Sequence, residues 1–259
     1  MKGLTEMSEN ASSLTSAASL PEPAVYESEY EYWPWGRLIE QVAGRVTTLA
    51  PLDATVFDYM CGTGYLLSRI ANDRPDLKCA GCDIHLPFVT YGKAKYLNID
   101  IRHADARVTG PPAPADVVLC TSGLHHVPFE EQSLILAKMA SECSPDGVAF
   151  IGEEMLGPVQ SERDRLRASI LLNSELIRMA VRDSWPASSV DAALMILHND
   201  VLCDGEYKRD KQAWRTLIEE SFVVNEIIDT WVAEAGGGDA IFLCRPRGLR
   251  LDRRPDALS

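Results

Sequence analysis

The middle of the chain alternates between short apolar runs and segments in which apolar residues recur every three or four positions. The short runs predict strands at Thr55–Asp58, Lys78–Asp83, Asp100–His103, Asp116–Thr121 and Val148–Gly152. The longer spacing predicts helices at Tyr65–Ala71, Val89–Tyr96 and Glu130–Cys143. Strands and helices that take turns so regularly favour a parallel sheet with helices on both faces.

The second half of the chain departs from this rhythm. Residues 156–205 read as mostly helical, with segments Ser161–Ala180 and Ser189–His198 joined at Trp185-Pro186. A helix at Lys211–Glu220 is followed by two apolar runs, which the glycine-rich stretch 236–239 connects: Val223–Trp231 and Ala240–Cys244. Two strands with so short a connection are predicted to be antiparallel.

The N-terminal region has a different composition. Residues 1–24 are rich in Ser, Ala, Glu and Thr and are predicted to be a disordered or loosely docked tail. An aromatic cluster at Tyr26–Trp35 and an amphipathic helix follow, and we interpret the cluster either as part of a ligand site or as packing for that helix. The predicted organisation is a tail (1–24), a helical cap (25–54), an α/β core (55–155), a helical lid insertion (156–210) and a C-terminal part that completes the sheet (211–259).

Composition limits the class of protein. The net charge of −13 and the pI near 4.8 argue against a partner such as nucleic acid, which usually requires a basic surface. The seven cysteines are odd in number and scattered, which suits reduced thiols, and the Cys79-x-x-Cys82 pair lies inside a predicted strand without a second pair. Neither a transmembrane run nor a signal peptide is expected, so the predicted location is cytoplasmic.

The turn after the first predicted strand contains candidate binding chemistry. The stretch at 56–67, VFDYMCGTGYLL, runs from an apolar strand through an acid and a Gly-x-Gly turn into a helix. Gly62 and Gly64 allow a ligand to approach the backbone closely. A dinucleotide site would have a third glycine where Leu67 stands, and the chain has no GK[ST] phosphate loop. NAD and ATP are therefore disfavoured.

Acids at three strand ends indicate a different ligand. Asp83 follows Gly64 by 19 positions, which suits a carboxylate that accepts both ribose hydroxyls. Asp105 could accept from an adenine amino group, and Asp58 could meet an ammonium group, because a carboxylate there would repel a pyrophosphate. Taken singly, each acid could instead cap a turn. Together they favour adenosine attached to a positive group without phosphate.

The order of these motifs resembles the class I S-adenosylmethionine-dependent methyltransferases. The match runs over roughly Val56–Phe150. Its motifs are DYMCGTG at 58–64, CDI at 82–84, ADA at 104–106, SGLHHV at 122–127 and PDG at 145–147. The resemblance implies a Rossmann-like α/β fold with a seven-stranded, mostly parallel sheet, an antiparallel C-terminal strand pair and a helical lid insertion.

The same resemblance implies a set of cofactor-binding residues. Gly62 and Gly64 would approach the methionine and ribose parts, and Asp83 would hold the ribose hydroxyls. Met60 stands where the family has its first glycine, so we expect strand-like backbone angles there. The complete predicted set for S-adenosylmethionine is Asp58, Met60, Cys61, Gly62, Thr63, Gly64, Asp83, Ile84, Asp105, Ala106, Thr121 and Ser122.

Methyl transfer needs alignment of the acceptor and, for some acceptors, a base. The candidates are His125, His126 and Glu153, with Glu153 and Glu154 alternatively binding a cationic substrate. The spacing of His198, Asp200 and Glu206 could hold a metal, but we favour a surface loop there and predict no metal site.

The predicted activity is methyl transfer from S-adenosylmethionine to an O, N or C nucleophile of a small molecule, in specialised metabolism (EC 2.1.1.-). A non-methyl reaction such as a cyclisation, or a non-catalytic binding module, remains the alternative. RNA or protein methylation ranks lower, because no asparagine-proline motif follows the fourth strand at Thr121–Leu124. No nucleic-acid or membrane partner is expected, and homodimer formation stays open.

Overall fold

A computed structural model describes residues 20–247, so most of the predicted tail, residues 1–19, lies outside the described residues. Seven strands form one sheet in the order β3-β2-β1-β4-β5-β7-β6. They are β1 (Thr55–Tyr59), β2 (Lys78–Asp83), β3 (Asp100–His103), β4 (Ala115–Thr121), β5 (Cys143–Leu156), β6 (Phe222–Val232) and β7 (Gly237–Pro246). The first five run parallel, whereas β7 pairs antiparallel with both β5 and β6. The predicted fold class is confirmed.

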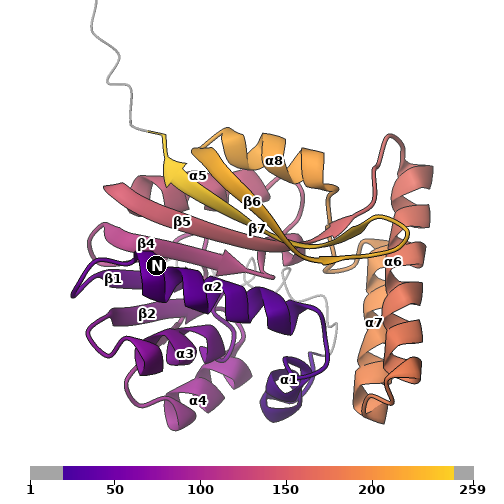
Figure 1. Ribbon diagram of the computed structural model, residues 1–259, viewed down its shortest axis with the longest axis horizontal. Helices are drawn as coiled ribbons and strands as arrows, with labels where there is room; N and C mark the ends of the chain where they lie inside the picture. Colours follow the sequence, from indigo (N-terminus) through magenta and orange to yellow (C-terminus); the bar gives the residue numbers. More distant parts are fainter. Residues whose placement is uncertain (1–19, 248–259) are drawn as a thin grey trace, which may run out of the picture.

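Helices cover both faces of this sheet (Figure 1). On one face lie α2 (Trp35–Leu49), α3 (Tyr65–Asp73) and α4 (Leu86–Lys95), with the short α1 (Pro23–Glu29) beside α4. On the other face lie α5 (Gln132–Glu142) and α8 (Lys211–Glu219). The helices α6 (Glu162–Arg182) and α7 (Ala187–Leu202) form an antiparallel pair at one end of the sheet.

Because successive side chains of a strand point to opposite faces of the sheet, they pack into two separate hydrophobic cores. In β1, Phe57 and Tyr59 point toward α5 and α8, while Val56 points toward α2 and α3. Parallel strands buried on both faces require such continuous apolar runs. The amphipathic pattern of α2 buries Leu38 and Val42 completely against the second core. Each such side chain contributes about 1.5–3 kcal/mol relative to an exposed position.

The fifth strand is longer than the sequence indicated. The predicted turn Pro145-Asp146-Gly147 lies inside β5, where the pairing with β4 shifts between Ala115↔Cys143 and Val117↔Val148. At the other end, β5 continues through Glu153 and Glu154 because β7 supplies an antiparallel partner for both. The two glutamates therefore lie on a strand and are buried.

The loop that joins β5 to the pair α6–α7, which we call the lid pair after its predicted role, is fixed by one acid. Asp210 caps α8 by accepting a hydrogen bond from the backbone N–H of Ala213 at 2.8 Å. Its other carboxylate oxygen accepts from the backbone N–H of Val159 at 2.9 Å. The start of α8 is thereby tied to the segment that enters α6. Among residues 20–247, no helix combines the length and apolar character needed to cross a bilayer.

Two helical glycines allow a matched test of this packing. A Cβ on Gly92 would lie 2.1 Å from the carbonyl oxygen of Thr63, whereas a Cβ on Gly44 would meet nothing within 4 Å. We expect Gly92→Ala to lower the free energy of unfolding by about 2 kcal/mol or more, since the clash is with backbone. Gly44→Ala should raise it by about 0.5–1 kcal/mol. Urea denaturation would measure both, and equal effects would contradict this packing.

Candidate functional site

The glycine turn is held in place by a carboxylate from the next strand. Asp83 Oδ2 accepts from the backbone N–H of Gly62 at 2.8 Å, and Asp83 Oδ1 accepts from the N–H of His85 at 2.7 Å. Gly62 and Gly64 have φ angles of +56° and +81°, which favour glycine. Asp83 therefore connects the turn after β1 to the end of β2.

Met60 does not adopt the predicted strand-like angles. Its φ is +62°, in the left-handed region. The prediction was wrong because the absence of glycine was read as the absence of a positive φ. The backbone must reverse directly after Tyr59, and the Met60 side chain packs half-buried against the core and beside Gly123. The turn thus uses positive φ at three alternate positions.

Asp58 is a buried acid with an unused oxygen. The residue is 1% exposed, and its Oδ1 has no hydrogen-bond partner among the described residues. Burial, together with the nearby Asp83, raises the pKa of Asp58 to about 8. Thr63 Oγ1, in the turn, is also buried without a partner. Such orphaned groups are rare in folded proteins, and they fit a ligand that carries its own donors.

The other residues that were predicted to contact adenine are less clearly part of a binding site. Asp105 is half-buried and forms an ion pair with Arg107 at 2.6 Å, so its carboxylate is already partnered. Ala106 is buried, while Ile84 is 37% exposed at the end of β2. Ile84 follows Asp83 directly, and the backbone N–H of Ala104 donates to the carbonyl oxygen of Asp83, which brings the segment with Asp105 and Ala106 to the end of β2. The contact of these three side chains with a base stays a prediction.

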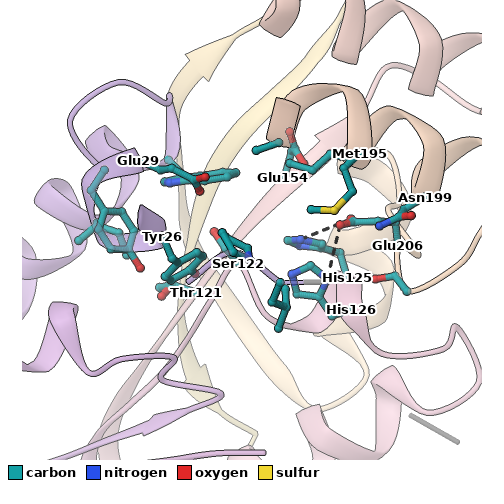
Figure 2. Close-up of a pocket in the computed structure, with 18 residues that line it drawn as sticks. Tyr26, Glu29, Thr121, Ser122, His125, His126, Glu154, Met195, Asn199 and Glu206 are labelled. Atoms are coloured by element: carbon teal, nitrogen blue, oxygen red, sulfur yellow. Dashed lines mark hydrogen bonds and ion pairs between the residues drawn. The ribbon is translucent and has the colours of Figure 1, made fainter. Parts of the chain in front are cut away.

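A pocket opens at the carboxyl ends of β4 and β5, where α/β sheets usually bind ligands. Figure 2 shows Tyr26 and Glu29 on one side of it and Glu154, Met195, Asn199 and Glu206 on the other. Thr121 and Ser122 lie between the two sides. The remaining lining comes from Leu20, Pro21, Tyr30, Trp35, Ile39, His125, His126, Ala192, Ile196 and Gly205.

Glu153 and His125 form a buried pair at this pocket. His125 Nδ1 lies 2.6 Å from Glu153 Oε2, and Glu153 Oε1 accepts from the backbone N–H of Leu124 at 2.8 Å. Burial lowers the pKa of His125 well below its usual value and raises that of Glu153 to about 8. With Nδ1 directed at the carboxylate, Nε2 is the nitrogen that faces the pocket.

His126 plays a different structural part. Its side chain is 41% exposed, and its Nδ1 lies 3.0 Å from the carbonyl oxygen of Gly205. From the sequence, His125 and His126 were both predicted as candidate bases. The short 3₁₀ helix η2 (Leu124–His126) separates them by placing His125 inside and His126 toward solvent.

The region of His198, Asp200 and Glu206 is not the surface loop that we favoured. His198 is exposed on α7, but Asp200 is 1% exposed and Glu206 is 6% exposed. Both bind the buried Lys208, whose Nζ lies 2.8 Å from Asp200 Oδ2, 2.8 Å from Glu206 Oε2 and 2.9 Å from Glu154 Oε2. Asp200 lies on the buried side of α7, which the polar residues around it in the sequence did not indicate.

Ligating atoms of His125, His126 and Glu206 lie within 4.8 Å of one another. The sequence had not grouped these residues, because the histidines and the glutamate come from distant segments. Asp200, which sequence spacing had grouped with Glu206, points instead to Lys208.

The aromatic cluster packs the N-terminal helices and also lines the pocket, while its contact with a ligand stays a prediction. Tyr26 and Tyr30 line the pocket, and Tyr26 also stacks on Phe88 at 4.7 Å between ring centroids. Trp33 and Trp35 stack at 4.6 Å, and Trp33 contacts Trp185 of the lid. The cluster thereby connects the N-terminal cap to the lid pair.

Two pocket features were missed in the sequence. Glu29 is 2% exposed, lines the pocket, and its Oε1 has no hydrogen-bond partner among the described residues. The helical spacing of Tyr26, Glu29, Tyr30 and Trp33 was a usable signal for it. Lys208 gave no such signal, because its burial depends on contacts between separate elements.

Comparisons with known proteins agree with this geometry. Residues 56–147 match the family model of a methyltransferase domain. A search among functionally curated proteins gave no match.

Solved structures with similar folds include three methyltransferases. A mitomycin 7-O-methyltransferase is 20% identical with a TM-score of 0.53, covering 79% of this chain and 53% of its own. A TehB-like S-adenosylmethionine-dependent methyltransferase from Corynebacterium glutamicum is 12% identical with a TM-score of 0.52, covering 79% and 86%. An O-methyltransferase from neocarzinostatin biosynthesis, solved with S-adenosylmethionine and 2-hydroxy-5-methyl naphthoic acid, is 13% identical with a TM-score of 0.52, covering 81% and 57%. The chain spans little more than half the length of the first and third.

The backbone at Met60 can be tested by substitution. Met60→Val should lower the free energy of unfolding by about 2 kcal/mol, since a β-branched side chain tolerates positive φ poorly. Met60→Asn should cost less, because asparagine enters the left-handed region readily. Thermal and urea denaturation would measure the difference. A valine variant as stable as the asparagine variant would contradict the φ of Met60.

Proposed function

We propose that this chain, whose residues 56–147 match the family model of a methyltransferase domain, transfers a methyl group from S-adenosylmethionine to a small molecule. The observation that carries the proposal is the position of His125. Its Nε2 faces the same pocket as Thr121 and Ser122, and Glu153 fixes its other nitrogen. The imidazole is thus oriented as a base at the place that the end of a ligand bound to the glycine turn would reach.

The turn fits the cofactor by its chemistry. S-adenosylmethionine supplies a reactive methyl group on a sulfonium when it is bound. Asp58, with its orphaned Oδ1, would hold the cofactor's ammonium group, and Asp83 would accept the ribose hydroxyls. Gly62 and Gly64 leave the backbone open to close approach. No group in this set suits a pyrophosphate.

The protein's own residues provide alignment and proton removal. Burial keeps the His125 ring neutral, so that Nε2 can accept a proton from the acceptor group. Glu153 holds the ring orientation through Nδ1. The lid pair α6–α7 and the cap helix α1 would exclude water from the pocket during transfer.

A small molecule is the acceptor class that the pocket supports best. Aromatic and apolar side chains form much of the wall, and the chain carries a net charge of −13. Two structures of the same fold are a mitomycin 7-O-methyltransferase and an O-methyltransferase from neocarzinostatin biosynthesis. We therefore place the activity in specialised metabolism, in the cytoplasm.

Cofactor binding is the first test. Calorimetry should show that wild-type protein binds S-adenosylmethionine and S-adenosylhomocysteine, and that Asp83→Asn weakens both by about 10- to 100-fold, because hydrogen bonds to a charged acceptor are lost. Asp146→Asn is the control, since Asp146 is an exposed acid within β5. Thermal midpoints would separate lost binding from lost folding. Absence of wild-type binding would overturn the proposal.

The base is tested with an acceptor found by screening for release of S-adenosylhomocysteine. His125→Gln should lower kcat/KM by about 10²–10⁴-fold, with Glu153→Gln close to it, because both residues act as one unit. Cofactor affinity should change less than threefold. His198→Gln is the control, because His198 is exposed on the lid. Full activity of the His125 variant would refute its role as a base.

A further inference from the structure

The charge of the pocket narrows the substrate class. Its described lining contains the carboxylates of Glu29, Glu154 and Glu206, and no lysine or arginine. All three glutamates are less than 10% exposed. Glu154 and Glu206 share the ammonium group of Lys208, whereas Glu29 has no cationic partner among the described residues. Because buried carboxylates that are incompletely neutralised are costly, a pocket of this kind favours a positively charged occupant.

Lys208 satisfies only part of this charge. Five buried carboxyl groups surround the region behind the pocket, and Lys208 contacts three of them. Asp239 Oδ2 has no hydrogen-bond partner among the described residues. The five acids are Glu153, Glu154, Asp200, Glu206 and Asp239. Burial raises the pKa of Glu153 and of Asp239, so these two acids favour the neutral form and add little negative charge. Lys208 then faces Glu154, Asp200 and Glu206, and one ammonium group shared by three carboxyl groups is compatible with a further cation in the pocket.

The position for that cation is beside the pair formed by His125 and Glu206. His125 Nε2 and Glu206 Oε2 lie 3.7 Å apart, and both are acceptors when Nδ1 carries the ring proton and donates it in a hydrogen bond to Glu153. An ammonium nitrogen beside this pair can donate one hydrogen to each acceptor at a normal distance of about 3 Å, whereas the gap is too narrow for a nitrogen between them. Asn199 lines the same side of the pocket (Figure 2).

On this geometry, and resting on the proposed methyltransferase function, we propose that the methyl acceptor is a small-molecule amine that enters as its ammonium ion. Glu206 and His125 Nε2 receive its N–H groups. The aromatic side chains of Tyr26, Tyr30 and Trp35 on the opposite side suit the organic part of such a cation.

The transfer balances in protons and electrons. An N–H bond of the ammonium ion breaks, and the proton passes to His125 Nε2. The lone pair left on nitrogen forms the new bond to the methyl carbon. The bond between that carbon and sulfur breaks, and its electron pair stays on sulfur. The product is a methylated ammonium ion, and the proton on His125 returns to solvent as the product leaves.

A divalent metal is the competing occupant of the same position. Three observations favour the amine. His126 Nδ1 is engaged with the carbonyl of Gly205, which leaves fewer free ligands. The Lys208 ammonium shares the Glu206 carboxylate and would repel a divalent ion about twice as strongly as a monovalent ammonium ion at the same distance. The facing wall is aromatic, which suits an organic cation.

The test compares benzylamine with benzyl alcohol by calorimetry on full-length protein saturated with S-adenosylhomocysteine. The pair differs in charge but hardly in shape. We expect benzylamine to bind at least tenfold more tightly. Glu206→Gln should remove that preference, while Glu130→Gln, which changes an exposed glutamate, should keep it. Thermal midpoints and cofactor affinity would confirm that both variants fold.

The outcomes separate the two proposals. Equal affinity for amine and alcohol, with cofactor binding intact, would overturn the amine assignment and leave the methyltransferase proposal standing. Binding of Zn²⁺ or Mg²⁺ that Glu206→Gln abolishes, without an amine preference, would overturn it in favour of a metal. Failure of the wild type to bind S-adenosylhomocysteine would overturn both. The wild-type comparison stands even if the Glu206 variant does not fold.

Discussion

The site depends on one buried lysine and the three carboxylates around it. Lys208 Nζ joins Glu154 of β5, Asp200 of α7 and Glu206 of the segment between α7 and α8. Removing one partner from such a buried arrangement costs about 3–5 kcal/mol, because the other charges lose compensation. The lysine therefore holds the lid pair against the end of the sheet. It also sets where the Glu206 carboxylate points.

The geometry of the proposed base follows from the same end of the sheet. Because β7 extends the pairing of β5 beyond the parallel part, Glu153 remains on a rigid strand as it reaches His125. A backbone hydrogen bond from Leu124 fixes the second carboxylate oxygen. The imidazole is thus oriented by a strand and a helical turn, without dependence on a mobile loop. Groups held in this way lose little entropy when the acceptor arrives.

Much of the fold could be predicted because local pattern and packing agree. The strand at Lys78–Asp83 has the same limits in the sequence and in the structure, since its apolar residues are buried on both faces. The glycine turn and Asp83 were also found, because their spacing is short and follows from the strand order. Met60 was misread because positive φ depends on how the chain leaves β1, which its residue type does not reveal.

The pocket could be predicted only in part because it is made by long-range contacts. His125 and Glu153 are 28 residues apart, and His125 and Glu206 come from segments that meet only in the folded chain. Asp200 and Glu206 are buried although their neighbours in the sequence are polar. The reason is the same, because their burial depends on contacts between distant segments. The periodicity of apolar residues predicts the buried face of one helix or strand at a time. The charge of a pocket, in contrast, depends on residues from several helices and strands.

Electrostatics connects the two halves of the site. Asp58 lies at the glycine turn, and Glu154 and Glu206 lie across Thr121 and Ser122 on the lid side. A cofactor with a sulfonium and an ammonium substrate would repel each other in a neutral pocket, and the repulsion would be strong at low effective dielectric. Buried carboxylates on both sides would offset that repulsion and would allow the two to bind together. In the proposed reaction, transfer of a proton to His125 would make the substrate nitrogen neutral as it approaches the methyl group.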